Sequence, residues 1–467
     1  MTRRHRTSSR REKIHPTPEP PASARWTIWP QAQPPVCRGV LWAILILYLL
    51  AATSLALRQP IDLGKGGPDT RFSPPDESAH VAYFAEFART HRIPRFTSGS
   101  GNYEAHQPPL YYLALTPLYL LAAPLGAAGQ VIVLRLAGVV MGGLSVILLA
   151  WLSCRLFECH RHAVPLATAI GALWPARVIA CTGVSNDAAV ELAGIAALLV
   201  LAYVAENNLA RRRSFVAGLA VGIVLLVKSS ALPLVVVGGL ALYLSYLRSA
   251  DAETGQLAPG RPFGIAVAAF ALGLVLMWGP WAARNTLTYG DPLAASVFEQ
   301  IFSKDRAGPD YFISRGLTGA QYYELVVYQT GLSFLGVLGQ ANLYLPAGYY
   351  VLGFLWIAGA VVLAAWKYLR RDPPLTEQTL PWALLVLQLA FTVALFFRFN
   401  AVFYQAQARY FMPSTGALAL YFARPWLRRA GPAWLPWAAL VIYVLLALCP
   451  PLFYLLGMTS PTPPSFL

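Results

Sequence analysis

The chain has 467 residues, of which 57% are hydrophobic and only 12% are charged. A soluble domain usually carries about 25% charged residues, so this composition excludes an ordinary water-soluble protein and indicates lipid as the main solvent. The net charge of +15 comes from basic residues that are unevenly placed along the chain, which indicates membrane orientation before nucleic-acid binding.

The chain begins with a segment, 1–36, that is rich in Arg, Ser and Pro and is predicted to be a disordered basic tail. An apolar run, 39–57, follows it. Because the tail is long and the run has no small-residue cleavage site, we expect a retained first membrane span and not a removed signal peptide. The membrane domain extends over 37–457, and a short Pro-rich tail, 458–467, ends the chain.

Apolar runs of about 20 residues, long enough to cross the hydrocarbon core as helices, recur throughout the membrane domain. They predict an all-α polytopic membrane protein with about eleven transmembrane helices. The expected spans are 39–57, 131–153, 163–182, 186–205, 214–228, 230–247, 263–283, 345–366, 380–398, 409–424 and 434–455.

Segment 109–125 is apolar but short, and it contains Pro109, Pro117 and Pro124. Proline removes a backbone donor and kinks a helix. We therefore expect a juxtamembrane or re-entrant helix in the first outer loop that does not cross the membrane.

The distribution of charge sets the expected orientation. With the N-terminus inside and 109–125 uncrossed, the segments on the inside hold 21 Lys and Arg and 8 Asp and Glu. The two large outer loops, 59–108 and 283–330, hold 9 Lys and Arg and 11 Asp and Glu. This positive-inside bias places the N-terminus in the cytoplasm. The inside segments are 1–38, 154–162, 206–213, 248–262, 367–379 and 424–431.

Eight ionisable residues other than histidine lie in or beside the spans, and this topology places all of them in the outer half of the membrane. They are Arg58, Arg135, Arg177, Asp187, Glu191, Lys228, Arg398 and Arg409. A charge inside a bilayer costs at least about 2.5 kcal/mol and usually marks function. Long basic side chains also snorkel to the interface, but the short side chains of Asp187 and Glu191 do not. We infer an outward-facing polar cavity with an excess of cations, suited to an anionic group such as a phosphate.

Five scattered cysteines, Cys37, Cys154, Cys159, Cys181 and Cys449, imply no disulfide framework. Two of them lie beside His160 and His162, in an arrangement compatible with a metal site or with a short cytoplasmic turn. We favour the turn, because the spacing matches none of the usual zinc patterns.

The first outer loop contains acids close to histidines. Asp76 and Glu77 follow two prolines and favour the start of a helix, and His80 lies four residues after Asp76 on the same face. Beyond starting a helix, a carboxylate and an imidazole on one face serve proton transfer or hold a divalent metal. A second cluster contains Glu104, His106 and Gln107 before a tyrosine-rich helix; an interfacial aromatic belt accounts for the tyrosines but not for the acid and the imidazole.

Six short motifs occur in a fixed order along residues 39–425. They are Asp76-Glu77; Glu104-Ala105-His106-Gln107-Pro108-Pro109-Leu110-Tyr111-Tyr112; Ser185-Asn186-Asp187; Lys228-Ser229-Ser230; Pro280-Trp281-Ala282-Ala283-Arg284-Asn285; and Arg409-Tyr410-Phe411-Met412-Pro413. In these motifs and in its topology the chain resembles the GT-C superfamily of lipid-linked-sugar glycosyltransferases, in particular the bacterial protein O-mannosyltransferase and lipid A aminoarabinose transferase type. The second motif of the aminoarabinose transferases is Glu-Lys-Pro, with its Lys implicated in phosphate contact. This sequence has no Lys there, so Lys228, Arg284 and Arg409 are the expected substitutes.

The resemblance implies a sugar donor on a polyprenyl phosphate or diphosphate, a lipid, glycan or protein as acceptor, and an active site at the outer face of the bacterial cytoplasmic membrane. Transfer is expected to invert the anomeric carbon, with Asp76 as general base and Glu77 as the second catalytic acid. Lys228, Arg284 and Arg409 are expected to stabilise the departing phosphate. The remaining substrate-binding residues are expected to be His80, Glu104, His106, Gln107, Asn186, Asp187 and Tyr410. Asp76, His80 and Glu104 form a candidate site for a divalent cation cofactor.

Other functions fit parts of the same pattern. A secondary transporter of an organic anion also has buried charges and broken helices, but its site lies near the midplane, often between internal repeats. A non-catalytic lipid-binding subunit of the envelope leaves Asp76, Glu77 and Asp187 without a role. A polymerase or ligase joining preassembled glycans shares the outer site with the glycosyltransferase.

Overall fold

The computed structural model describes residues 28–63, 72–97, 102–249, 260–305, 307–370, 380–427 and 432–464. These ranges form helices joined by turns, with no strand beyond two isolated bridges. The α-helices are α1 (Pro35–Arg58), α2 (Glu77–Thr90), α3 (Leu110–Leu121), α4 (Gly126–Leu156), α5 (Ala163–Ala172), α6 (Pro175–Ala180), α7 (Asp187–Ala205), α8 (Arg211–Val227), α9 (Pro233–Arg248), α10 (Gly260–Tyr289), α11 (Ala295–Asp305), α12 (Pro309–Ile313), α13 (Gly319–Leu335), α14 (Ala347–Arg370), α15 (Leu380–Asn400), α16 (Thr415–Ala423) and α17 (Trp434–Leu455). Short 3₁₀ helices are η2 (Tyr103–His106), η3 (Ala123–Leu125), η4 (Ser229–Ala231), η5 (Ala408–Ser414) and η6 (Arg424–Trp426).

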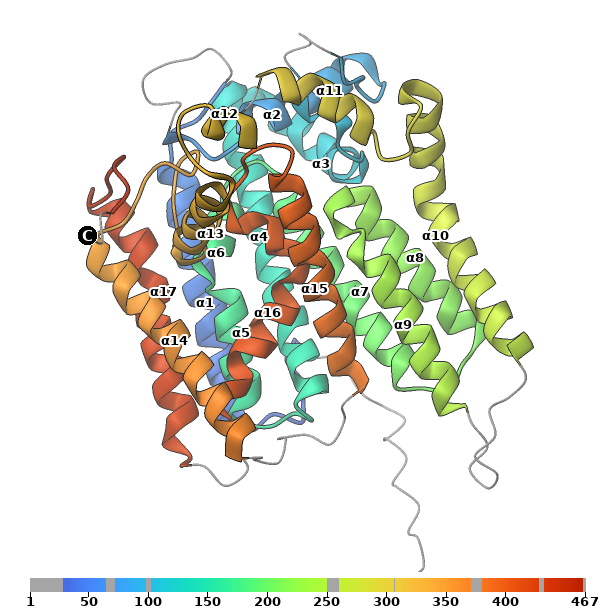
Figure 1. Cartoon of the computed structure of the whole chain (residues 1–467), viewed down its shortest axis with the longest axis vertical. Coiled ribbons are helices and arrows are strands. Elements are labelled where there is room, and N and C mark those ends of the chain that lie inside the picture. The colour runs from blue at the N-terminus through green and yellow to red at the C-terminus, as the bar shows by residue number, and fades with distance from the viewer. Residues whose placement is uncertain are drawn as a thin grey trace, which may run out of the picture.

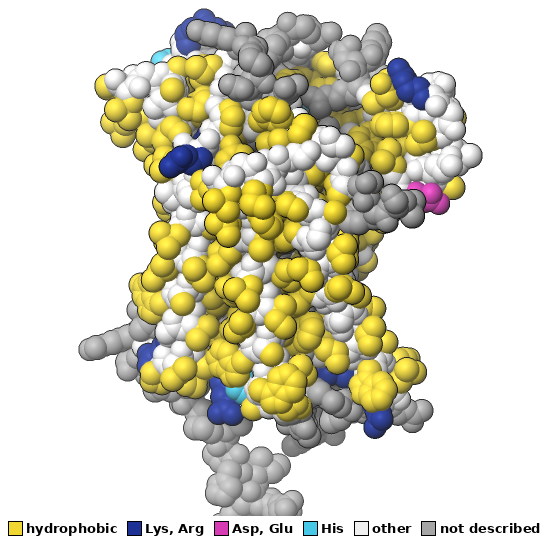
Figure 2. Space-filling model, turned by 90° about the vertical axis from the view of Figure 1, so that its left-hand side faces the viewer, with side chains coloured by type: hydrophobic (Ala, Val, Ile, Leu, Met, Phe, Trp, Pro, Cys, Tyr) yellow, Lys and Arg dark blue, Asp and Glu magenta, His cyan; other side chains and the backbone are white. Residues whose placement is uncertain are grey.

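The predicted all-α membrane fold is confirmed. Eight helices in the described ranges are long and apolar enough to cross a membrane, and each of them overlaps one of the predicted spans over nearly the whole length of that span. Figure 2 shows hydrophobic side chains covering the middle of one face, with Lys and Arg side chains near its two ends. This is the surface expected of a protein solvated by lipid around its middle.

The other three predicted spans are shorter or broken. Segment 163–182 is divided into α5 and α6, because Pro175 begins a new helix after the extended Trp174. Segment 409–424 is divided into η5 and α16, with Pro413 inside the 3₁₀ turn. Helix α8 has 17 residues and a length of about 26 Å, just under the thickness of the hydrocarbon core.

Helix α3 agrees with the prediction of a juxtamembrane helix at 109–125. It has 12 residues, contains Pro117 and ends before η3, so it is too short to span. Figure 1 shows α3 beside α2 and α11 at one end of the bundle, with α12 also at this end. In its described residues, the second outer segment, predicted as 283–330, holds the end of α10, the helices α11 and α12, and most of α13.

The opposite end of the bundle gathers the segments that were predicted to share the inside. The Gln33 side chain donates to the carbonyl of Cys159 (2.6 Å), and the Ser245 hydroxyl donates to the carbonyl of Asn207 (2.6 Å). The N-terminal tail lies outside the described residues up to position 27, and the C-terminal tail lies outside them from 465 onward.

One feature of this end differs from the expectation. A disulfide joins Cys154 to Cys159, although the sequence analysis predicted no disulfide framework. The two cysteines bracket the turn between α4 and α5, where the backbone of Cys159 also donates to the carbonyl of Cys154. A bend tight enough to bring residues five positions apart together is not visible in cysteine spacing alone.

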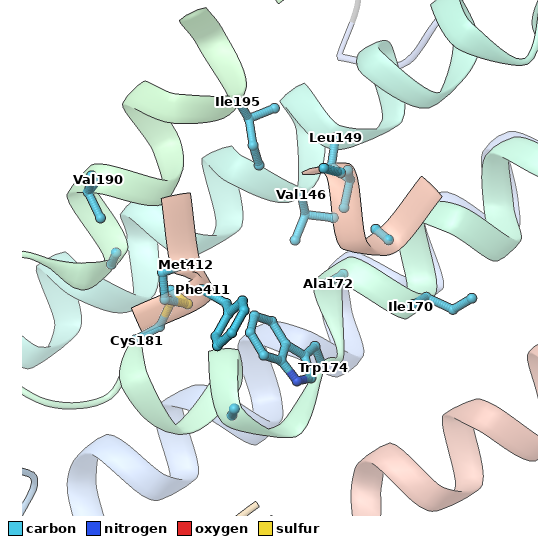
Figure 3. Packing of buried hydrophobic residues seen from close by; sticks show 14 of the residues in the cluster. Val146, Leu149, Ile170, Ala172, Trp174, Cys181, Val190, Ile195, Phe411 and Met412 are labelled. Atoms are coloured by element: carbon cyan, nitrogen blue, oxygen red, sulfur yellow. The ribbon is translucent and has the colours of Figure 1, made fainter. Parts of the chain in front are cut away.

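The core lies where α4, α5 and α7 meet the η5 turn. Figure 3 shows Phe411 and Met412 of η5 among Val146 of α4, Val190 of α7 and Trp174, which lies between α5 and α6. Within this core Arg177 of α6 pairs with Glu191 of α7 at 2.6 Å, and both side chains are buried. The guanidinium also lies 4.5 Å from the centre of the Tyr48 ring. Two of the eight predicted charges therefore satisfy each other inside the protein and do not face a cavity.

Glycines allow α8 and α10 to pack backbone against backbone. A Cβ added at Gly218 would lie 2.0 Å from the carbonyl oxygen of Phe270, and one at Gly273 would lie 2.4 Å from that of Phe215. Small residues permit such close approach of helices in membranes. Gly264, on the same helix as Gly273, has nothing within 4 Å of its added Cβ.

We expect Gly273→Ala to destabilise the protein by about 1–3 kcal/mol, because the new methyl group overlaps backbone that cannot yield. Gly264→Ala is the matched control and is expected to be neutral or stabilising by up to about 1 kcal/mol, since alanine is the better helix former. Thermal unfolding of both variants in detergent checks this. An equal effect of the two substitutions contradicts the packing described here.

Candidate active site

Four charged residues reach one place from four helix ends. Asp76 precedes α2, Asp187 begins α7, Lys228 follows the last residue of α8, and Arg409 lies in η5. The backbone of Asp76 is in the left-handed region (φ 62°, ψ 7°), which residues other than glycine seldom occupy. Such strain costs about 1–3 kcal/mol and is concentrated at functional sites.

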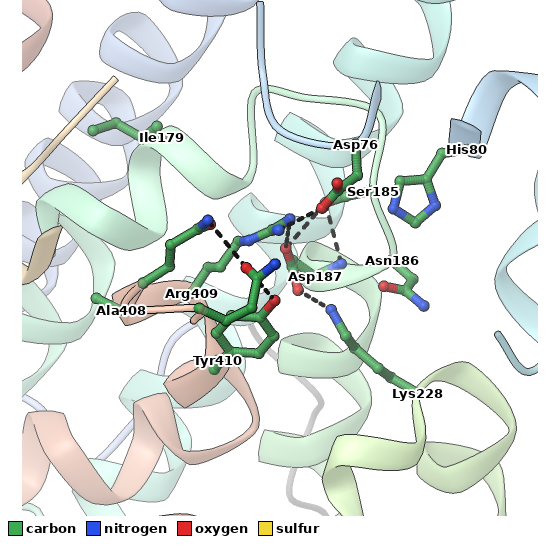
Figure 4. A network of polar contacts seen from close by, with 12 residues as sticks. Asp76, His80, Ile179, Ser185, Asn186, Asp187, Lys228, Ala408, Arg409 and Tyr410 are labelled. Atoms are coloured by element: carbon green, nitrogen blue, oxygen red, sulfur yellow. Dashed lines mark hydrogen bonds and ion pairs between the residues drawn. The ribbon is translucent and has the colours of Figure 1, made fainter. Parts of the chain in front are cut away.

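These four side chains form one alternating chain of ion pairs (Figure 4). Arg409 bonds to Asp76 and lies 3.7 Å from Asp187, and Asp187 bonds to Lys228. The second oxygen of Asp76 accepts a hydrogen bond from the Tyr103 hydroxyl (3.0 Å). The charges within this chain balance, which removes most of the cost of placing them away from water.

Beside the ion pairs lies a cavity of about 460 Å³, lined by residues of both outer segments and of α15. The Asp76 side chain is 20% exposed, whereas that of Asp187 is 2% exposed. Of the two carboxylates in the chain, Asp76 is thus the one that a ligand in the cavity can reach. The polar and charged residues of the lining are Asp76, His80, Tyr103, Glu104, His106, Gln107, Lys228, Ser229, Ser230, Glu299, Thr392, Arg398, Gln405, Arg409 and Tyr410.

The expected excess of cations is wrong for this lining. Its Lys and Arg residues are Lys228, Arg398 and Arg409, and each pairs with a carboxylate; the partner of Arg398 is Glu299 at 3.4 Å. The number of charges along the chain does not show how they pair, because pairing depends on which faces of the helices meet.

The other wall of the cavity is aromatic. Phe298 and Phe302 of α11 lie 4.5 Å apart and pack on Phe403, which follows α15. Phe399, near the end of α15, completes this wall 4.4 Å from Phe403. The cavity is therefore bordered both by charged groups and by a surface suited to hydrocarbon.

Glu104 and His80 line the cavity next to the ion pairs, and both are at least nine-tenths buried. Burial raises the pKa of Glu104 above its ordinary value, against the opposing influence of His80. Burial lowers the pKa of His80, against the opposing influence of Glu104 and Asp76. The Nδ1 atom of His80 lies 2.7 Å from the Tyr112 hydroxyl. For both groups, burial thus shifts the protonation equilibrium toward the uncharged form.

The remaining predicted polar residues form hydrogen bonds with other residues of the site. The Asn186 side chain donates to the Gln107 side chain (3.2 Å) and to the carbonyl of Val227 (3.1 Å). Gln107 in turn lies 3.3 Å from the His106 ring. The Tyr410 hydroxyl donates to Gln405 (3.0 Å) at the edge of the cavity.

Glu77 lies apart from the cavity. It forms a fully buried pair with Arg135 of α4, at 2.5 and 2.7 Å, and accepts from the backbone N–H of Val184 (3.2 Å). Arg135 donates further to the carbonyls of Gln59 (2.8 Å) and Pro60 (2.6 Å). This placement suits a positioning residue, since it ties the start of α2 to the end of α1 and to the loop before Asp187.

Arg284 also lies away from the cavity lining. Its guanidinium donates to the carbonyl of Pro94 (2.7 Å) and stacks 4.8 Å from the centre of Trp281. It fastens the first outer segment to α10, so the structure does not bring it to the two other predicted phosphate ligands.

The three residues proposed for a divalent metal, Asp76, His80 and Glu104, all line the cavity. In the described part of the chain, however, no group of three or more His, Cys, Asp or Glu side chains is arranged to hold a metal ion. Asp76 is already bonded to Arg409 and Tyr103. As arranged in this structure, these three side chains do not form a donor set that fits a metal ion.

Two sets of residues were missed by sequence reasoning. Tyr103, which bonds to Asp76, stands directly before Glu104, the first residue of the second motif. Part of the aromatic wall had a usable signal: Phe298 and Phe302 are four residues apart and share one face of α11. Phe399 and Phe403 have the same spacing, but Phe403 lies beyond the end of α15.

No protein-family model and no curated protein sequence matches the chain. The Archaeoglobus fulgidus oligosaccharyltransferase tethered to an acceptor peptide is similar over 88% of this chain and 55% of its own, with 14% identity and a TM-score of 0.49. ArnT from Cupriavidus metallidurans bound to undecaprenyl phosphate is similar over 87% of this chain and 62% of its own, with 15% identity and a TM-score of 0.46. Both are GT-C membrane glycosyltransferases. This chain spans less than two thirds of either.

We expect Glu77→Gln to destabilise the protein by about 3–5 kcal/mol, because it leaves the Arg135 charge buried without a partner. Arg398→Gln removes a pair whose side chains are 65% and 48% exposed, and it is expected to cost less than about 1 kcal/mol. Thermal unfolding in detergent compares the two. A Glu77→Gln variant as stable as Arg398→Gln contradicts the positioning role.

Proposed function

We propose that the protein transfers a sugar from a polyprenyl-phosphate-linked donor to an acceptor hydroxyl in the cavity beside Asp76. The observation that carries this proposal is a single cavity bordered by a partly exposed carboxylate, by two cations and by an aromatic wall. A lipid-linked sugar phosphate has the three matching parts: a reacting centre, an anionic phosphate and a hydrocarbon chain.

Asp76 is the proposed general base. It would take the proton from the acceptor hydroxyl as the acceptor oxygen bonds to the anomeric carbon and the bond from that carbon to the phosphate oxygen breaks. Attack from the side opposite the phosphate inverts the anomeric carbon. Asp187 is buried and bonded to Lys228, which suits holding that cation in place more than accepting a proton.

Lys228 and Arg409 are the proposed phosphate ligands. Each is bonded to a carboxylate, so an incoming phosphate would compete with that carboxylate for the cation. When a phosphate draws Arg409 away, Asp76 loses a cation that weakens it as a base. Donor binding would thereby prepare Asp76 for proton transfer.

The cavity is proposed to face the outside of the bacterial cytoplasmic membrane, with the N-terminus in the cytoplasm. The basic residues concentrated at the opposite end of the bundle support this orientation. The acceptor would be a lipid, a glycan or a protein. A transporter site is expected near the midplane, and this cavity lies between the outer segments and the end of α15.

We expect Asp76→Asn to lower the rate of sugar transfer by about 10² to 10⁴, the usual contribution of a general base. Glu299→Gln is the matched control, because it changes another carboxylate of the same lining and is expected to stay within about threefold of wild type. Both variants are assayed in proteoliposomes made with a membrane lipid extract that supplies the native donor. A transfer rate for Asp76→Asn within tenfold of the wild-type rate would exclude Asp76 as the general base.

We expect Lys228→Gln to weaken inhibition of transfer by added undecaprenyl phosphate by at least about tenfold, because a charge-assisted hydrogen bond is lost. Arg284→Gln, which changes a cation outside the lining, is expected to leave that inhibition unchanged. Comparing the inhibition constants of undecaprenyl phosphate for the two variants shows which of the two cations binds the phosphate. Equal weakening of the inhibition in both variants would show that Arg284 also contributes to phosphate binding.

A further inference from the structure

Three carboxyl side chains line the cavity; Asp76 and Glu299 pair with arginines, and Glu104 forms no ion pair with a described residue. Its side chain is on η2, the residue is 7% exposed, and it lines the cavity. Its Oε2 atom is buried and has no hydrogen-bond partner among the described residues. The nearby cations Lys228 and Arg409 bond to Asp187 and Asp76 instead.

A buried carboxylate without a partner is costly, so a carboxyl in this position is favoured in its neutral form. The neutral group has an O–H that donates and a C=O that accepts. It therefore offers a ligand two kinds of hydrogen bond and no charge.

His80 supplies a second group of the same character. It is 3% exposed, it lines the cavity, and its Nδ1 atom is held by the Tyr112 hydroxyl at 2.7 Å. No described residue bonds to its Nε2 atom. The contact at Nδ1 fixes the orientation of the ring. A hydrogen bond at one ring nitrogen commonly sets the role of the other nitrogen, here Nε2.

We propose that Glu104 and His80 form an uncharged hydrogen-bonding subsite that binds hydroxyl groups of the transferred sugar. The proposal rests on the function proposed above. It assigns each part of the donor to the part of the cavity whose chemistry matches it. The phosphate would lie against Lys228 and Arg409, and the hydrocarbon against the phenylalanine wall. A sugar hydroxyl both donates and accepts, which matches a carboxylic acid beside a neutral imidazole.

The first test compares Glu104→Gln with Glu104→Ala in the proteoliposome assay. Glutamine keeps a donor and an acceptor without charge, so we expect its kcat/KM to stay within about threefold of wild type. Alanine leaves the sugar hydroxyls unpaired, and we expect at least a tenfold loss in kcat/KM. A loss for Glu104→Gln as large as that for Glu104→Ala shows that the ionised carboxylate is required, as for an amino sugar or a metal, and overturns the proposal.

The second test needs no variant to fold. N,N′-dicyclohexylcarbodiimide modifies neutral carboxyls in apolar surroundings, and mass spectrometry locates the product. We expect the wild-type protein to be labelled at Glu104 and not at the ion-paired Glu77. The lipid extract that carries the sugar donor should protect Glu104, whereas undecaprenyl phosphate without a sugar should not.

The outcomes separate this proposal from the one on which it rests. Protection of Glu104 by bare undecaprenyl phosphate would assign it to the phosphate. Sugar transfer by wild type with Glu104 unprotected by the donor would overturn the subsite alone. Absence of transfer by wild type would overturn the proposed function and the subsite with it.

Discussion

The structure depends on the pairing of charges that lie away from water. Asp76, Arg409, Asp187 and Lys228 belong to parts of the chain that are up to 333 residues apart, yet they alternate in sign along one line. Removing any one member leaves a neighbour without its partner in a poorly solvated place, which is far more costly than losing a surface pair. The chain of ion pairs therefore fixes the ends of α2, α7 and α8 relative to the η5 turn.

The same pairing reconciles a stable resting state with the binding of an anion. In a cavity lined by unpaired cations, the cations would repel one another and would attract any anion. Under the proposed function, the carboxylates would occupy the cations until a phosphate competes for them, and the competitor would need a sugar and a lipid chain that also fit the cavity. Selectivity would then arise from the neutral residues and the phenylalanine wall more than from charge, because charge alone is already satisfied.

Much of this arrangement could be predicted from the sequence, since hydropathy and charge are one-dimensional signals. The long spans, the juxtamembrane character of α3 and the gathering of Asp76, Asp187, Lys228 and Arg409 at one end all follow from these signals. The breaks in 163–182 and 409–424 did not, although Pro175 and Pro413 mark them, because proline also occurs inside transmembrane helices such as α17. Predicting the partners of Arg135, Arg177 and Arg284 requires knowing how each helix is rotated about its axis. The position of a residue along the chain does not give this rotation.

Asp76 and Glu77 show how far two adjacent acids can differ. Glu77 is the first residue of α2, and its side chain is held by Arg135 and by the backbone of Val184. Asp76 precedes the helix in a left-handed conformation, and its carboxylate turns to the cavity and to Arg409. Without the buried contacts of Glu77, a strained residue at this position would be expected to relax to an ordinary backbone conformation and withdraw its side chain. The rigid pairing of one acid thus supports the exposure of the other, which explains why a motif of two carboxylates can be required where only one of them reaches the ligand.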